Sequence, residues 1–287
     1  MAAPTDYRAL GRVVVAVDKT KYIEDLEKTA AFLFLIRPRR FGKSLFLNML
    51  NCYYDVKYAD RFEELFGNQY IGKHPTAEQG KYLVLRFNFS MVRATDDKLE
   101  AAFNRHISLE TAYFASVYAS YFKPDFQEQL KLIPEAAGRL EYICLCAKEQ
   151  GLSIYLLIDE YDNFTNTILS SKGNDVYHSL THDSGFYRSF FYVVKGVTTG
   201  AEAPVKRMFI TGVSPVTLDD VTSGFNIGTN ITTDERFNSM VGFSESELHD
   251  YSGNRAPYPN YTSFARYILW QNSNYRTRVS SSGQYHR

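Results

Sequence analysis

The fold is decided by residues 31–54, which read AFLFLIRPRRFGKSLFLNMLNCYY. The first six residues are continuously apolar, as expected of a β-strand that is buried on both faces of a sheet. The segment 37–44, RPRRFGKS, cannot continue this strand, and from residue 44 to 54 apolar side chains recur at helical spacing. These residues therefore predict a strand, a loop and a helix, in that order.

Gly42, Lys43 and Ser44 stand where this loop meets the helix, and they match the second half of the phosphate-binding motif G-x-x-x-x-G-K-[ST]. Glycine lets the backbone approach a phosphate, and the free N–H groups at a helix start favour an anion. We expect Lys43 to contact the β- and γ-phosphates of ATP and the Ser44 hydroxyl to hold Mg²⁺. The sequence thus predicts a site for ATP and Mg²⁺.

The loop departs from the motif at its start, because Arg37 stands where the first glycine is expected. Pro38 fixes one φ angle, so the loop depends less on glycine for its shape. Its arginines either add positive charge near the phosphates or face another acidic partner. A basic turn without a ligand is the alternative. The residues predicted to bind the nucleotide are Arg37, Pro38, Arg39, Arg40, Phe41, Gly42, Lys43 and Ser44.

Two acids, Asp159 and Glu160, follow the apolar segment 153–158, which is a second buried strand candidate. The carboxyl ends of strands in α/β sheets open onto the crevice where ligands bind. We therefore predict that Asp159 holds Mg²⁺ and that Glu160 orients or deprotonates the attacking water. The alternative is an acidic turn, since the segment 159–162 is polar in any case.

Strand-sized apolar segments alternate with longer amphipathic ones along the chain, which predicts an α/β fold with a mainly parallel sheet flanked by helices. The further strand candidates are 81–89, 207–211 and 225–231. The further helix candidates are 61–66, 97–122, 125–150 and 186–195. The three cysteines, Cys52, Cys144 and Cys146, fit core packing in a reducing compartment better than a disulfide framework or a metal site.

Thr211 ends the strand candidate 207–211. In P-loop proteins with an additional strand between the phosphate-loop strand and the acidic strand, the end of that strand carries a γ-phosphate sensor, and Thr211 fits this role with Ser214 as its neighbour. A threonine that caps a turn before Gly212 is the alternative. An arginine from a neighbouring subunit often assists γ-phosphate cleavage, which makes a homo-oligomer an expected partner. The candidates are Arg188, Arg207 and Arg236.

The 287-residue chain carries 32 Lys and Arg against 32 Asp and Glu. The cations are unevenly spread, because the last 37 residues hold five arginines and no acid, whereas residues 37–43 hold four cations. A protein that is basic throughout is excluded. No apolar run reaches the ~18 residues of a membrane span, and the first residues lack a secretory signal. We therefore expect an intracellular protein, cytoplasmic or nuclear, without a membrane partner.

Four segments together resemble the AAA-ATPase-like family, and they are VDKTKYI at 17–23, RPRRFGKS at 37–44, LIDEYD at 157–162 and ITGVSP at 210–215. The resemblance runs from about residue 7 to 248. It implies an AAA-type P-loop fold, in which Lys43 and Ser44 serve the nucleotide and Mg²⁺ and Asp159 and Glu160 form the acidic pair. Arg37 in place of glycine is similar to the family's usual loop.

The resemblance also divides the chain into an ATPase-like domain at 7–248 and a basic tail at 249–287 that is rich in Tyr, Ser and Arg. Many family members carry a restriction-endonuclease-like domain after the ATPase region. We expect that domain to be absent here, the helical lid after Phe243 to be cut short, and the tail to be divergent or disordered. Contact with nucleic acid is a further hypothesis, through Arg39 and Arg40 or through the tail.

These features predict slow, Mg²⁺-dependent ATP hydrolysis that is used as a switch. Two alternatives stay open. A nucleotide-responsive scaffold would bind ATP without turnover, and a P-loop kinase would transfer the phosphate to an acceptor with Asp162 as the base.

Overall fold

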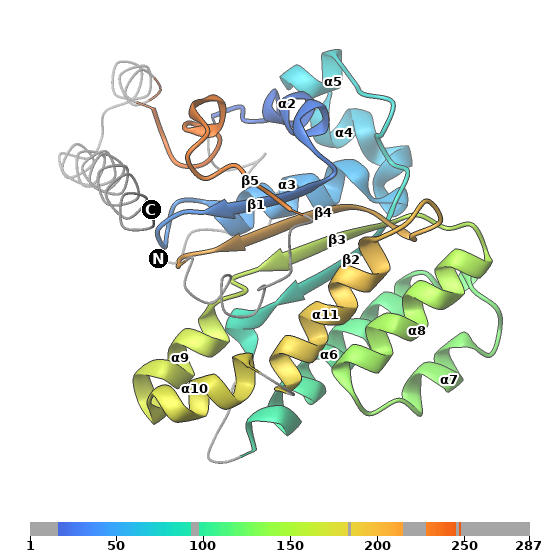
Figure 1. The fold of residues 1–287 in the computed structure, drawn as a ribbon. Coiled ribbons are helices and arrows are strands. Elements are labelled where there is room, and N and C mark those ends of the chain that lie inside the picture. The colour runs from blue at the N-terminus through green and yellow to red at the C-terminus, as the bar shows by residue number, and fades with distance from the viewer. Residues whose placement is uncertain (1–16, 93–97, 183–184, 215–227, 245–246, 248–287) are drawn as a thin grey trace.

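The structure of the 287-residue chain is a computed structural model, and it describes residues 17–92, 98–182, 185–214, 228–244 and 247. Figure 1 shows a central β-sheet with helices on both of its faces. This arrangement confirms the predicted α/β fold with a parallel sheet.

Five strands of the described chain form the sheet, in the order β2-β3-β4-β1-β5, and every neighbouring pair is parallel. They are β1 (Phe32–Ile36), β2 (Leu83–Asn88), β3 (Ile154–Asp159), β4 (Val205–Gly212) and β5 (Thr229–Asn230). The prediction of an additional strand is confirmed, because β4 lies between β1 and β3. Parallel strands have their carboxyl ends at one edge, so the ends of β1, β3 and β4 lie together there.

Two layers of helices cover the sheet (Figure 1). One face carries α2 (Tyr22–Thr29), α3 (Lys43–Tyr54), α4 (Phe62–Phe66) and α5 (Tyr70–Lys73). The other carries α6 (Leu99–Val117), α7 (Phe126–Lys131), α8 (Ala136–Glu149) and α11 (Phe186–Thr198). Beyond the carboxyl end of β3 follow α9 (Asn163–Lys172) and α10 (Asn174–Thr181), and short 3-10 turns are η1 (Val56–Arg61), η2 (Phe89–Met91), η3 (Ala119–Tyr121) and η4 (Glu235–Phe237).

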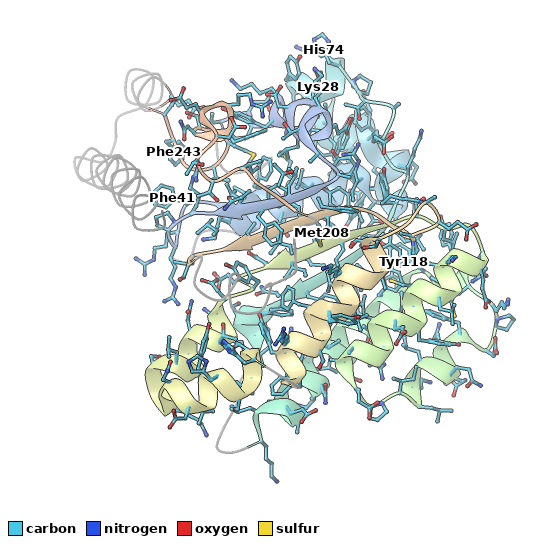
Figure 2. All side chains as sticks on the ribbon, in the orientation of Figure 1. Lys28, Phe41, His74, Tyr118, Met208 and Phe243 are labelled. Carbon is cyan, nitrogen blue, oxygen red and sulfur yellow. The ribbon has the colours of Figure 1, made fainter. Side chains whose placement is uncertain are left out.

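Successive side chains along a strand point to opposite faces of the sheet, so the apolar side chains are divided between two cores. Phe34 and Leu156 belong to the core beneath α6, α8 and α11, whereas Leu35 and Tyr155 belong to the core beneath α2 and α3. Met208, labelled in the middle of the sheet in Figure 2, is fully buried. Because both faces of the central strands are covered, these strands are continuously apolar, as their sequence predicted.

Several predicted boundaries were wrong. The candidate 125–150 is two helices, α7 and α8, because the connection between them contains Pro134, which a helix interior excludes. The candidate 97–122 ends as α6 at Val117 and continues as η3. Four helices, α2, α5, α9 and α10, were not predicted.

Other predictions fall partly or wholly on residues that the structure does not describe. The strand candidate 225–231 is observed as β5 over Thr229–Asn230, and residues 225–227 lie outside the described chain. The tail 249–287 also lies outside it. In the part of the chain that the structure describes, no helix is long and apolar enough to cross a membrane. Cys52 and Cys144 are buried in the two cores, as predicted.

Candidate functional site

The loop between β1 and α3 has the geometry that its glycine and helix start predict. Gly42 caps α3 with a φ of 85°, in the left-handed region that favours glycine. A Cβ at this position would meet no atom within 4 Å, so glycine is needed for the backbone angle and not for space inside the protein. Gly42 is exposed at the start of α3, where unpaired N–H groups can face an anion.

Two buried side chains anchor the loop. The Arg37 guanidinium donates to the carbonyls of Ile36, at 3.1 Å, and Thr232, at 2.5 Å. Phe41 is buried in the core beneath α2 and α3 and lies at the end of the sheet toward which the strand arrows point (Figure 2). Arg37 therefore anchors the loop to the segment after β5. Because its guanidinium is bound to these carbonyls, we expect Arg37 to meet a phosphate through its backbone and not through its side chain.

Arg39 and Arg40 are the exposed cations of the loop. Arg40 has a φ of 68°, so the backbone turns sharply here even without glycine. The charge of Arg39 acts on both Lys43 and Glu160. Of the three loop arginines, Arg39 and Arg40 are thus the ones whose side chains are open to a ligand or partner.

Lys43 is buried at the start of α3, and its ammonium group donates to the carbonyls of Arg37, at 2.9 Å, and Pro38, at 3.0 Å. Burial lowers the pKa of Lys43, and the charges of Asp159, Glu160 and Asp162 oppose this by raising it. Lys43 therefore lies close enough to the acidic segment for their charges to interact. The ammonium group is held by loop carbonyls at the place where a phosphate is expected.

Asp159 is the last residue of β3 and is fully buried. Its Oδ1 accepts a hydrogen bond of 2.7 Å from the Thr211 hydroxyl at the end of β4. Its Oδ2 is buried without a hydrogen bond, which is costly unless a cation is close. Thr211 therefore holds the Asp159 carboxylate here, and its role as a γ-phosphate sensor stays a prediction.

Glu160 follows directly and is half-buried, with a φ of 51°. Its Oε2 accepts a hydrogen bond of 3.2 Å from the Asn163 side-chain amide. Burial raises the pKa of Glu160, and the neighbouring charge of Asp159 raises it further, while Lys43 and Arg39 lower it. A carboxyl group with a raised pKa beside a buried lysine is a suitable base for an attacking water.

Asp162 ties the loop after β3 to the loop after β4. Its carboxylate accepts from the backbone N–H of Val213, at 3.0 Å, and of Ser214, at 2.5 Å, and from the Asn166 amide, at 2.9 Å. The Tyr161 hydroxyl donates to the Ser214 carbonyl at 2.5 Å. Both oxygens of the buried Asp162 are occupied, which disfavours it as the base of a kinase.

Arg86 and Asn48 were not predicted as site residues. The Arg86 guanidinium, on β2, lies 3.7 Å from Asp159 Oδ2 and hydrogen-bonds to the Asn48 side chain on α3. A signal was present, because Arg86 interrupts an apolar strand candidate, and a charge in a buried strand needs a partner.

The residues present fit Mg²⁺. Among the described residues no group of three or more His, Cys, Asp and Glu side chains could hold a metal ion. Mg²⁺ does not need such a group, because it is usually bound by one or two protein oxygens together with phosphates and water. Asp159 supplies a buried oxygen without a hydrogen bond, and the half-buried Ser44 stands at the start of α3.

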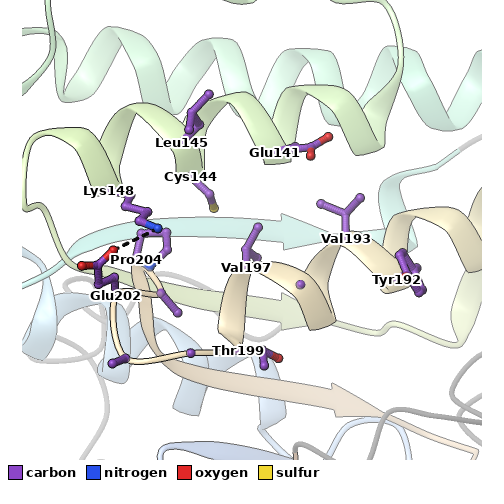
Figure 3. Close-up of a pocket in the computed structure, with 14 residues that line it drawn as sticks. Glu141, Cys144, Leu145, Lys148, Tyr192, Val193, Val197, Thr199, Glu202 and Pro204 are labelled. Atoms are coloured by element: carbon purple, nitrogen blue, oxygen red, sulfur yellow. Dashed lines mark ion pairs between the residues drawn. The ribbon is translucent and has the colours of Figure 1, made fainter.

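Two other features lie away from this edge. A cavity of about 710 Å³ lies between α8 and α11, lined by Cys144, Leu145 and Tyr192 among others, with the 3.1 Å ion pair of Lys148 and Glu202 at its margin (Figure 3). It sits beside the start of β4, opposite the carboxyl ends of the strands. Arg207, also near the start of β4, lies 3.5 Å from Glu78. This candidate for the arginine that assists γ-phosphate cleavage therefore has a partner within its own chain.

Comparison with known proteins gives the chain a family. A family model described as predicted AAA-ATPase matches residues 6–222. A protein of Azotobacter chroococcum mcd 1, described as an uncharacterized protein in the vnfD 5′ region, is 26% identical over 239 residues. This match covers 81% of the chain and 40% of that relative, so the chain spans less than half of the relative's length. No solved structure matches the chain.

Proposed function

Because the chain belongs to the predicted AAA-ATPase family, we propose that it binds ATP with Mg²⁺ and hydrolyses it slowly, and that this cycle serves as a switch. The observation that carries the proposal is that two buried charged groups, Lys43 and Asp159, lie close enough for the charge of Asp159 to act on Lys43. The ammonium group is held by two loop carbonyls, and the carboxylate has one oxygen that is free of hydrogen bonds. Each group is costly to bury, and a nucleotide with its metal ion would satisfy both.

Each residue of the site has a proposed role. The backbone N–H groups of Gly42 and the start of α3 bind the phosphates, and Lys43 exchanges its two loop carbonyls for phosphate oxygens. Ser44 and Asp159 hold Mg²⁺, which when bound neutralises charge on the phosphate oxygens. Glu160 orients the attacking water and accepts its proton, for which its raised pKa is suited.

The first test is ATP binding by isothermal titration calorimetry in the presence of Mg²⁺. Lys43→Ala removes the ammonium group, and we expect ATP binding to be lost. Lys131→Ala is the control, because Lys131 is an exposed lysine on α7, outside the candidate site. Equal ATP affinity in the wild type and Lys43→Ala would contradict the proposal.

The second test separates hydrolysis from the alternative of a scaffold without turnover. Phosphate release is measured at high protein concentration, so that an oligomer can form. We expect Glu160→Gln to retain ATP binding and to lose phosphate release, because the amide cannot accept the proton of water. Binding without phosphate release in the wild type would favour the scaffold. Release that rises with an added hydroxyl acceptor would favour the kinase.

A further inference from the structure

Arg86 joins three elements around the candidate metal site. It lies on β2, opposite Leu157 of β3, and its guanidinium hydrogen-bonds to Asn48 on α3, one helical turn after Ser44. Another of its nitrogens lies 3.7 Å from Asp159 Oδ2. The side chain is 30% exposed, so water reaches part of it. Arg86 is therefore a cation placed at the one Asp159 oxygen that is free of hydrogen bonds.

The contact between Arg86 and Asp159 is electrostatic and loose. A distance of 3.7 Å is too long for a charge-assisted hydrogen bond, which lies at about 2.7–2.9 Å. Arg86 gives the buried carboxylate a counter-charge without occupying its lone pairs. A cation that approaches Asp159 Oδ2 more closely has no hydrogen bond to break there.

The charge of Arg86 also acts on a second carboxylate. Glu110, on α6, is half-buried, and burial raises its pKa whereas the charge of Arg86 lowers it. The other nearby basic side chain is His106, whose Nε2 lies 3.9 Å from Glu110 Oε1. Burial lowers the pKa of His106, which keeps its imidazole neutral at pH 7. Arg86 is thus the positive charge that acts on Glu110.

We infer that Arg86 is a positioning residue that holds Asp159 until Mg²⁺ arrives and then shifts toward Glu110. The inference rests on the proposed function, since it assumes that Asp159 holds Mg²⁺. Arg86 and a divalent cation repel each other and compete for the same oxygen. Glu110 favours metal binding because it stabilises the guanidinium away from Asp159. Removing Arg86 and removing the Glu110 charge should therefore change the metal affinity in opposite directions.

The test uses Mn²⁺ as a probe for the Mg²⁺ site. The full chain is saturated with a non-hydrolysable ATP analogue, Mn²⁺ is added stepwise, and free Mn²⁺ is measured by electron paramagnetic resonance. A titration of the analogue without protein is subtracted, because the analogue alone also binds Mn²⁺. We expect Arg86→Gln to lower the dissociation constant of Mn²⁺ about tenfold, within the usual range of coupling between two sites. Glu110→Gln should raise it by a similar factor, and the double variant should resemble Arg86→Gln.

Arg86→Lys is the matched control, because it keeps the charge, and its Mn²⁺ affinity should stay closer to the wild type than that of Arg86→Gln. An unchanged or higher dissociation constant in Arg86→Gln would overturn the inference. If Arg86→Gln does not fold, an unchanged Mn²⁺ dissociation constant in Glu110→Gln would overturn the inference. Failure of the proposed function would give a different result. The wild type would then bind no Mn²⁺ in the presence of the analogue, and Lys43→Ala would behave like the wild type.

Discussion

Glu160 is held in an unusual backbone conformation by its neighbours. Its φ of 51° lies in the left-handed region, which costs a residue with a Cβ about 1–2 kcal/mol. The Tyr161 N–H donates to the Thr211 carbonyl at 3.1 Å, and the Asn163 N–H donates to the Glu160 carbonyl at 2.9 Å. These bonds on either side of Glu160 hold the turn in which its backbone takes this conformation.

The strain at Glu160 is measurable with two small residues. Glu160→Gly removes the left-handed cost, whereas Glu160→Ala keeps it. We expect the Gly variant to be more stable than the Ala variant by about 1 kcal/mol, although glycine ordinarily destabilises ordered structure. Urea unfolding of both variants gives the difference. A less stable Gly variant would show that Glu160 does not bear this strain.

The raised pKa of Glu160 predicts a pH dependence of stability. Burial makes the folded chain hold the Glu160 proton to a higher pH than the unfolded chain, in which the pKa of Glu160 has its ordinary value of 4.5. Between 4.5 and the raised value, the contribution of Glu160 to the free energy of unfolding falls as pH rises. Glu160→Gln removes this penalty, so the variant should exceed the wild type in stability at pH 8.

The difference between Glu160→Gln and the wild type should shrink as pH falls, and it should be smallest below 4.5, where the Glu160 carboxyl group is protonated in both the folded and the unfolded chain. Urea unfolding at several pH values measures it. Glu202→Gln, at an exposed acid in the loop beside the cavity, is a control for the loss of one negative charge. A difference that does not change with pH would contradict the assignment to Glu160.

The residue-scale contacts show what could be predicted from the sequence. Gly42, Lys43 and Ser44 were assigned from local order alone, because a strand, a loop and a helix fix where their backbone lies. The orientation of Arg37 was beyond reach, since its partner Thr232 is distant in sequence. The Thr211 hydroxyl likewise bonds to Asp159 across two strands. Side-chain direction depends on long-range packing, which a single sequence does not display.

At the scale of elements, the loops after β3 and β4 form one connected unit through Asp162. Three donors converge on its carboxylate, and two of them are the backbone N–H groups of Val213 and Ser214. Gly212 belongs to the same unit, because a Cβ there would lie 2.2 Å from the Tyr161 ring. The position of Glu160 therefore depends on a junction made by both loops.

Asp162→Ala should destabilise the chain by about 3 kcal/mol, because it leaves backbone donors unpaired in a largely buried place. Asp162→Asn keeps one acceptor oxygen and should cost about 1 kcal/mol. Urea unfolding measures both values. Equal and negligible effects would show that the junction does not stabilise the fold. Full ATP binding in Asp162→Asn would agree with a structural role for this residue.

The elements differ in how well the sequence predicts them. The strands β1 and β3 were predicted within one residue, because they are buried on both faces and read as apolar runs. The helices α9 and α10 were missed because neither has a long apolar stripe. They are held by the packing of a few buried residues, such as Phe164 and Tyr177. The edge strand β5 has two residues, too few for any periodicity to appear.

At the scale of the whole molecule, the charge is divided. Residues 1–250 carry 27 cations against 32 anions, and the five remaining arginines lie in the last 37 residues. Four cations crowd into residues 37–43 at the candidate site. Neutrality is thus the sum of an acidic body and a basic end. Contact with nucleic acid through that end, and assembly into a homo-oligomer, stay predictions.

Nucleotide binding should stabilise the whole chain. A ligand at a hundred times its dissociation constant adds about 2.7 kcal/mol to the free energy of unfolding. For a chain of this size that corresponds to a rise in melting temperature of about 5–10 °C. Differential scanning calorimetry with and without ATP and Mg²⁺ measures the rise. Lys43→Ala should show none, and a rise of the same size in that variant would place the nucleotide elsewhere.

The order of the strands has a consequence for how the chain acquires its structure. Among the described strands, β1 pairs with β4 and β5 alone. Leu35 of β1 lies beside Thr211 of β4, so β1 has no neighbouring strand until that distant segment has paired with it. Such distant pairing makes folding slow, and an apolar strand without neighbours is prone to aggregate. During synthesis, the phosphate loop emerges well before the acidic segment 159–162 and before β4, so it acquires its neighbours only after these later segments have been made.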